Sequence, residues 1–223
     1  MVSIKLSKSK IIDYYNNSGK IIEVSNLTTS YKNYLKAEED FLKKTIPERA
    51  NILEIGAGQG RIIDVLNNGK RKITGIEIAN ASFLKNRYKH DKNITISKMD
   101  AHKLVFRNDS FDFCLIMYNT LGLMYNPLKV LKECKKIVGS GGKIVISTYT
   151  TEEEYVLKER MKCFTKLGHK IIKVRGLDFE INKGIASHYF KEDELKKLFK
   201  DAKLKTIYYH LTKLGCIWTA IKV

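Results

Sequence analysis

The feature that most constrains the fold is a glycine-rich turn at the end of a short apolar run. Ile52 to Ile55 is followed by Gly56-Ala57-Gly58-Gln59-Gly60, and an amphipathic stretch begins at Arg61. Glycines let the chain turn sharply where a strand ends, and they let a ligand approach the backbone closely. A dinucleotide fingerprint needs glycine at its sixth position, where this chain has Arg61, which disfavours a nicotinamide enzyme. The pattern therefore predicts a strand, a ligand-binding turn and a helix.

Apolar β-rich runs alternate with amphipathic stretches from residue 50 onward, which predicts an α/β fold with a mostly parallel sheet and helices on both faces. The expected strands are 50–56, 72–78, 94–100, 111–117 and 143–149, and the expected helices are 61–67, 82–88 with Ser82 as its cap, 127–138, 152–164 and 192–202. The stretch 168–186 is compatible with a β-hairpin, and 205–213 with 216–223 predicts a C-terminal antiparallel hairpin. We expect one domain over 1–223, with a core from residue 50 and a small insertion near 165–187.

The first 49 residues predict a helical cap on this core. Tyr31 to Lys44 has helical periodicity, and Pro47 ends it. One interpretation is a packing helix that covers the sheet. The alternative is a lid over a ligand, formed by Tyr14, Tyr15 and Tyr31.

Three further segments follow the glycine turn in a recognisable order. Glu77 ends the second expected strand, Lys98-Met99-Asp100-Ala101 ends the third, and Val138-Gly139-Ser140-Gly141-Gly142-Lys143 precedes the fifth. Together with residues 52–60, they resemble the motifs of class I S-adenosylmethionine-dependent methyltransferases, from about residue 50 to the C-terminus. The family often has proline in the turn before the fifth strand, where this chain has Ser140.

The resemblance implies a Rossmann-like seven-stranded sheet and S-adenosylmethionine as cofactor. It implies that the glycine turn passes beneath the amino-acid part of the cofactor, while Glu54 positions its ammonium group. Glu77 would accept from the ribose hydroxyls, and Asp100 with the amide of Ala101 would address the adenine. The implied cofactor-binding set is Glu54, Gly56, Ala57, Gly58, Gly60, Glu77, Ile78, Asp100, Ala101 and Met117.

The methyl acceptor is expected beyond the fourth strand, beside Met117-Tyr118-Asn119-Thr120. Enzymes of this fold that methylate exocyclic base amines or glutamine usually have an Asn/Asp-Pro-Pro-aromatic tetrad there, which this chain lacks. Tyr118 and Asn119 are candidates to hydrogen-bond an acceptor amine or hydroxyl, although each is equally suited to capping the loop. His188 is a candidate general base, the alternative being a structural or exposed histidine. Cys114 is interpreted as core packing, because it lies inside a strand.

The formal charge of +17 favours polyanionic partners in principle. The 41 basic residues comprise 34 Lys and 7 Arg, however, and specific phosphate recognition relies on Arg more than on Lys. We therefore interpret the surplus chiefly as a solubilising surface. The first hypothesis is methyl transfer to N or O of a small molecule. The others are an RNA methyltransferase that uses the Lys-rich surface, and a non-catalytic cofactor-binding or RNA-interaction module.

Neither a metal site nor a disulfide framework is expected, because Cys114, Cys134, Cys163 and Cys216 are far apart and form no CxxC pair. Residues 1–10 lack the apolar core of a signal peptide. No apolar run approaches the roughly 18 residues that a membrane span needs. We therefore expect a cytoplasmic protein without a membrane partner, and the sequence leaves the oligomeric state open.

Overall fold

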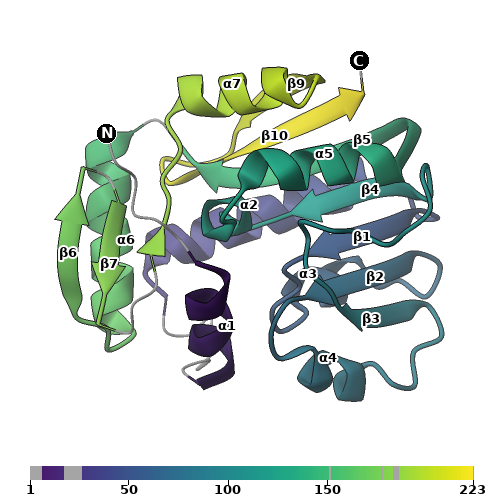
Figure 1. Ribbon diagram of the computed structural model, residues 1–223, viewed down its shortest axis with the longest axis horizontal. Helices are drawn as coiled ribbons and strands as arrows, with labels where there is room; N and C mark the ends of the chain where they lie inside the picture. Colours follow the sequence, from purple (N-terminus) through teal and green to yellow (C-terminus); the bar gives the residue numbers. More distant parts are fainter. Residues whose placement is uncertain (1–6, 18–26, 151, 177, 183–185, 223) are drawn as a thin grey trace.

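A mostly parallel sheet forms the centre of the fold. The computed structural model describes residues 7–17, 27–150, 152–176, 178–182 and 186–222, and within them seven strands follow the order β3-β2-β1-β4-β5-β10-β9 (Figure 1). In that order they are Ile94–Lys98, Lys72–Glu77, Asn51–Ile55, Phe111–Ile116, Val138–Tyr149, Gly215–Lys222 and Leu204–His210. The first five are parallel, and β10 is antiparallel to both its neighbours. The expected α/β fold and C-terminal antiparallel hairpin are confirmed.

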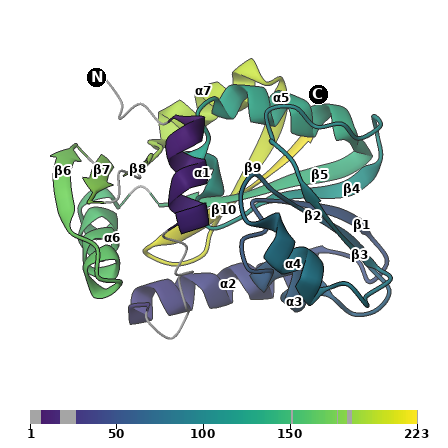
Figure 2. The ribbon, with the colours of Figure 1, turned by 60° about the horizontal axis from the view of Figure 1, so that its bottom comes forward.

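Helices cover both faces of this sheet, α5 (Pro127–Ile137) and α7 (Glu192–Asp201) on one side and α2 (Thr29–Thr45) and α3 (Arg61–Leu66) on the other (Figure 2). Consecutive side chains of a strand point to opposite faces. Leu53 therefore packs into the core beneath α5 and α7, and its neighbour Ile52 packs into the core beneath α2 and α3. This burial on both faces explains the nearly continuous apolar runs of the central strands.

The remaining elements lie beyond the sheet. α1 (Lys8–Asn17) lies between the sheet and a unit made of α6 (Glu153–Lys166) and a second, antiparallel sheet (Figures 1 and 2). That sheet consists of β6 (Ile171–Arg175), β7 (Asp178–Ile181) and β8 (Ala186–Ser187), so the hairpin expected within 168–186 is present. Residues 1–6 and 18–26 of the expected cap, and 177 and 183–185 of the expected insertion, lie outside the described residues.

Two local expectations were wrong. β5 begins at Val138, so the four residues Gly139-Ser140-Gly141-Gly142 lie within the strand, with a register shift against β4. A Cβ atom on Gly142 would lie 2.8 Å from the carbonyl oxygen of Asp112, so glycine allows this close backbone contact. Ser82 lies inside α4 (Ala81–Arg87), and the residue at the N-cap is Asn80, with a left-handed φ of 30°.

Candidate cofactor and acceptor site

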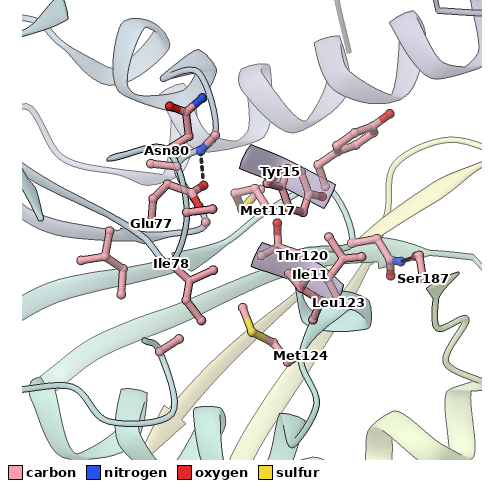
Figure 3. A pocket seen from close by; sticks show the side chains of 18 of the residues that line it. Ile11, Tyr15, Glu77, Ile78, Asn80, Met117, Thr120, Leu123, Met124 and Ser187 are labelled. Atoms are coloured by element: carbon pink, nitrogen blue, oxygen red, sulfur yellow. Dashed lines mark hydrogen bonds between the residues drawn. The ribbon is translucent and has the colours of Figure 1, made fainter. Parts of the chain in front are cut away.

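A cavity of about 640 Å³ opens where the carboxyl ends of β1 to β4 face α1 and α6. Open parallel sheets bind their ligands at this end of the strands. Figure 3 shows side chains from both sides of the cavity, with Glu77 and Ile78 from the sheet opposite Ile11 and Tyr15 from α1. The cavity reaches all the expected cofactor residues except Gly60, and it also reaches Tyr118 and Asn119.

The glycine turn crosses the floor of this cavity with a strained backbone. Gly56 and Gly58 have positive φ values of 72° and 55°, and the N–H groups of Gly56 and Ala57 both donate to the carbonyl oxygen of Ile76. A Cβ atom on Gly58 would point into open space, so its backbone is accessible to a ligand. Gly60 has another reason to be glycine, because a Cβ atom there would lie 2.1 Å from the hydroxyl oxygen of Tyr88.

Glu77 stabilises the turn from the end of β2. Its Oε1 atom accepts a hydrogen bond of 2.5 Å from the N–H of Gly58, drawn as a dashed line in Figure 3. Burial raises the pKa of Glu77, and the N–H groups of Gly58 and Ile78 act against that rise. The carboxylate thus lies at the cavity wall beside the turn, where the resemblance places the ribose acceptor.

Glu54 has a buried carboxyl group, one oxygen atom of which lacks a hydrogen-bond partner in the described part of the chain. The residue is 4% exposed, its Oε2 atom has no hydrogen-bond partner among the described residues, and burial raises its pKa well above the ordinary value. A buried charge that lacks a partner is costly, whereas a carboxylate facing an ammonium group is stabilised. Since Glu54 borders the cavity, its chemistry fits the ammonium group of S-adenosylmethionine.

Asp100 is held by donors from three segments. Its Oδ2 atom accepts from Lys8 Nζ at 2.6 Å and from the Tyr125 hydroxyl at 3.1 Å, and its Oδ1 atom lies 2.7 Å from His102 Nδ1. Burial opposes the charge, but the hydrogen bonds from Lys8 and His102 hold the pKa of Asp100 well below its usual range. Asp100 and Ala101 both border the cavity.

His102 lies in the loop after β3, beside Asp100. It is buried, its ring stacks on Tyr125 with centroids 3.6 Å apart, and its Nε2 atom accepts from the N–H of Asn126. Because Nε2 accepts, the ring proton lies on Nδ1 and is donated to Asp100. Burial lowers the pKa of His102, which keeps this imidazole neutral.

Glu38, which sequence reasoning did not identify, joins α2 to both halves of the site. Its fully buried carboxylate accepts from Arg61 Nη2 at 2.5 Å, from the N–H of Tyr118 at 3.1 Å and from the hydroxyl of Ser147. It therefore connects the helix after the glycine turn with the end of β4. The available signal was a glutamate on the apolar face of a periodic helix.

Tyr118 and Asn119 form an unusual turn directly after β4. Both have positive φ values, 52° and 54°, which are uncommon for residues other than glycine. The N–H of Asn119 donates to the carbonyl oxygen of Ser147, and its side-chain Nδ2 atom donates to Ser187 Oγ at 2.8 Å and to the carbonyl oxygen of His188 at 3.2 Å. The turn thus joins β4, β5 and β8 at the cavity, where Met117 also lies.

The geometry of His188 does not support the role of general base. His188 does not border the cavity. Its Nδ1 atom lies 2.8 Å from Asp178 Oδ2, and its Nε2 atom lies 2.9 Å from Glu194 Oε2. Burial opposes a charge on the ring, but the two carboxylates outweigh it and raise the pKa of His188 to about 9. The residue is a charged link between β7 and α7, which corresponds to the structural alternative.

The tyrosines of the N-terminal segment divide between the two interpretations of the cap. Tyr14 and Tyr15 border the cavity from α1, as a lid requires. Tyr31 is buried behind it and lies 3.1 Å from the hydroxyl of Tyr149, as a packing helix requires. α2 is therefore a packing helix, and α1 is the segment to which the lid interpretation applies.

The four cysteines are free and buried, and Cys114 lies in the core of β4. Among the described residues, no group of three or more His, Cys, Asp or Glu side chains is arranged to hold a metal ion. Within the same part of the chain, every helix is too short or too polar to cross a bilayer.

The sequence matches known proteins over part of its length. Residues 53–146 match the family model described as a methyltransferase domain. An uncharacterized protein of Methanocaldococcus jannaschii is 38% identical over 112 residues, a segment that spans 50% of this chain and 50% of that relative.

Solved structures share the fold. A protein of Pyrococcus horikoshii OT3 has a TM-score of 0.70 at 16% identity, over 96% of this chain and 97% of that one. The 1,6-didemethyltoxoflavin-N1-methyltransferase of Burkholderia thailandensis, solved with 1,6-didemethyltoxoflavin and S-adenosylhomocysteine bound, has a TM-score of 0.67 at 13% identity, over 96% and 86%.

The family match covers part of the chain, and the fold extends beyond it. The chain contains a methyltransferase domain over residues 53–146, and it shares its fold with solved S-adenosylmethionine-dependent methyltransferases. Its methyltransferase domain contains all of β2, β3 and β4, which provide the ends of the expected cofactor site.

Proposed function

We propose that this chain transfers a methyl group from S-adenosylmethionine to a nitrogen or oxygen atom of a small molecule. The observation that carries the proposal is the continuity of the cavity. One space extends from Glu54 and Glu77 at the ends of β1 and β2 to Tyr149, Phe164 and Ser187 on the far side. It therefore has room for a donor and an acceptor next to each other.

The sulfonium of the bound cofactor supplies an activated methyl group, so the protein has to align the acceptor and exclude water. In this chain, Glu54, Glu77 and the glycine turn would hold the cofactor. Tyr118 and Asn119 would contact the acceptor. α1 covers the cavity with Ile11, Tyr14 and Tyr15, which limits the access of water.

The basic residues argue for a small acceptor over RNA. Among the described residues that border the cavity, the cationic side chains are Lys8 and Arg61. Lys8 is paired with Asp100, and Arg61 is paired with Glu38 and Glu39. Neither is thus placed to bind a phosphate backbone. The Burkholderia enzyme named above also acts on a small heterocycle.

The test is methyl transfer by the purified chain. S-adenosylmethionine with a labelled methyl group is incubated with a small-metabolite extract and, separately, with total RNA. We expect label in the small-molecule fraction, and label confined to RNA would overturn the proposal. Titration calorimetry with S-adenosylhomocysteine addresses the non-catalytic hypothesis, because binding without transfer to either pool would favour it.

A further inference from the structure

We propose that the acceptor is an uncharged aromatic molecule with a nucleophilic nitrogen, and that an N–H group of this molecule donates a hydrogen bond to Oδ1 of Asn119. Asn119 would thereby determine the specificity of the reaction. This inference rests on the proposed function and narrows it to a class of substrate.

The first step of the argument is the orientation of the Asn119 side chain. Nδ2 donates to the carbonyl oxygen of His188, and a carbonyl can only accept. The amide nitrogen Nδ2 therefore faces β8, and Oδ1 faces away from β8. Asn119 is only 3% exposed, it borders the cavity, and its Oδ1 atom has no hydrogen-bond partner among the described residues.

An unpaired buried acceptor destabilises the free protein. A ligand that places an N–H or O–H group at this atom removes that destabilisation, whereas a ligand without a donor leaves it in place. The orphaned oxygen therefore selects for donors. Among the described residues that border this cavity, the other buried oxygen atom without a partner is Oε2 of the Glu54 carboxyl group, which lies at the cofactor end.

The second step is the rigidity of the turn that carries Asn119. Left-handed backbone at consecutive non-glycine residues is unfavourable and persists only where the surroundings hold it. Here the carboxylate of Glu38 and the hydroxyl of Ser147 accept from the N–H of Tyr118. On the other side, a Cβ atom on Gly122 would lie 2.4 Å from the carbonyl oxygen of His188, so the turn packs directly on β8. The oxygen is thus preorganised.

The third step is the character of the walls around this part of the cavity. On the side of α1, η2 (Thr120–Leu123) and α6 the described lining residues are uncharged, apart from Lys8, which is paired with Asp100. Figure 3 shows Ile11, Tyr15 and Leu123 facing one another there. A charged acceptor would lose its hydration in this space without gaining a partner, whereas a flat apolar ring packs well against aromatic and aliphatic side chains.

The buried guanidinium of Arg160 also disfavours a cationic acceptor. The guanidinium of Arg160 is fully buried and lies 5.1 Å from the ring centroid of Tyr149, whose side chain borders the cavity. One face of that ring is therefore already engaged by a positive charge. A cationic acceptor would be repelled at this position.

The last step concerns the side chains that could remove a proton from the acceptor. Burial raises the pKa of Tyr118 well above its ordinary value and raises the pKa of Cys163 to about 12, so both cavity residues stay protonated near neutral pH. Both ring nitrogens of His188 are engaged by carboxylates. The acceptor therefore has to be nucleophilic before it loses a proton, which favours nitrogen over a hydroxyl. The nitrogen whose lone pair lies outside the ring's π system forms the new N–C bond, and the C–S bond breaks with its electrons remaining on sulfur. The cationic product then loses the proton of its N–H group to water.

The experiment compares four probes by titration calorimetry on the wild-type chain saturated with S-adenosylhomocysteine, at mildly alkaline pH. Benzimidazole is aromatic, uncharged and has an N–H group, and in 1-methylbenzimidazole a methyl group replaces the hydrogen of that group. Benzylamine and benzoate are the cationic and anionic aromatic probes. We expect benzimidazole to bind best, about tenfold or more tighter than its methylated form. Equal binding of that pair, or tighter binding of either charged probe, would overturn the inference.

Two variants separate a specific hydrogen bond from a structural role. In Asn119→Ala the affinity ratio of the two benzimidazoles should fall toward one, whereas a structural role would weaken both probes alike and leave the ratio unchanged. Asn80→Ala is the matched control, since Asn80 also borders the cavity with a positive φ but lies beside α4. This control should keep the ratio. If Asn119→Ala does not fold, the four probes on the wild-type chain still decide.

The outcome also distinguishes this inference from the proposed function. Failure of S-adenosylhomocysteine to bind the wild-type chain would overturn the enzyme assignment itself. Cofactor binding with methyl transfer to charged metabolites alone would leave a small-molecule methyltransferase and refute the uncharged aromatic acceptor.

Discussion

The ammonium group of Lys8 lies 2.6 Å from Oδ2 of Asp100, which ties α1 to the loop that follows β3. α1 covers the cavity, and Asp100 borders it. This ion pair therefore links the helix that covers the cavity to the loop that forms part of its wall. It gives α1 a point of attachment that the sequence did not reveal.

Lys8→Met should speed the release of S-adenosylhomocysteine several-fold while leaving the melting temperature nearly unchanged. The pair is half-exposed, and exposed ion pairs contribute little to folding stability. Stopped-flow fluorescence measures the dissociation rate. Lys10→Met is the control, because Lys10 is an exposed lysine of the same helix that does not border the cavity. Equal rates in both variants would show that α1 is not held by this pair.

Gly58→Ala and Gly69→Ala form a matched pair that isolates ligand approach from backbone strain. Both glycines have positive φ, and a Cβ atom at either would meet no atom closer than 4.0 Å. Each substitution should therefore cost a similar amount of stability, about 1 kcal/mol. Only Gly58→Ala should weaken S-adenosylhomocysteine, by about tenfold or more in a calorimetric titration, because only Gly58 borders the cavity. Similar cofactor affinities would place the ligand elsewhere.

Glu54→Gln should stabilise the free protein and weaken the cofactor. Because burial raises the pKa of Glu54, the folded state binds its proton more tightly than the unfolded state, so wild-type stability declines as pH rises above about 4.5. Glutamine does not titrate, and the variant should melt at a higher temperature near neutral pH. The lost charge-assisted hydrogen bond to an ammonium group should lower S-adenosylhomocysteine affinity about tenfold or more. A variant with wild-type affinity would remove Glu54 from the ammonium site.

His188→Gln should destabilise the fold in a pH-dependent manner. The pKa of His188 is raised from 6.5 to about 9, so its contribution is fully present below about pH 6.5 and is lost as pH rises through 9. The variant should lose about 1–3 kcal/mol at slightly acidic pH and much less above pH 9. Urea unfolding at several pH values measures the difference. Asp178→Asn should show the same trend, whereas a pH-independent loss in both would exclude the charged link.

The class of this protein follows from short-range features of the sequence. A glycine turn after an apolar strand can be recognised locally, because the left-handed backbone of Gly56 and Gly58 depends on the residues themselves. The alternation of apolar runs and amphipathic stretches further predicts the order of the strands and helices. Within that order, Glu77 marks the end of a strand. These local features predicted the sheet, which is confirmed, and they placed the expected cofactor residues at strand ends that border one cavity, Gly60 excepted.

The tertiary structure decided which polar side chains work together. Glu38, Ser147 and Tyr118 are far apart in sequence, and only the packing of α2 against the ends of β4 and β5 brings them into contact. The same holds for His188, whose pairing with Asp178 and Glu194 turned a candidate base into a structural cation. Burial and pairing set the protonation of such groups, and both depend on long-range contacts that no local pattern encodes. The glycine turn thus identifies the methyl donor from sequence alone, whereas the orphaned oxygen of Asn119, which points to the acceptor, exists only in the folded chain.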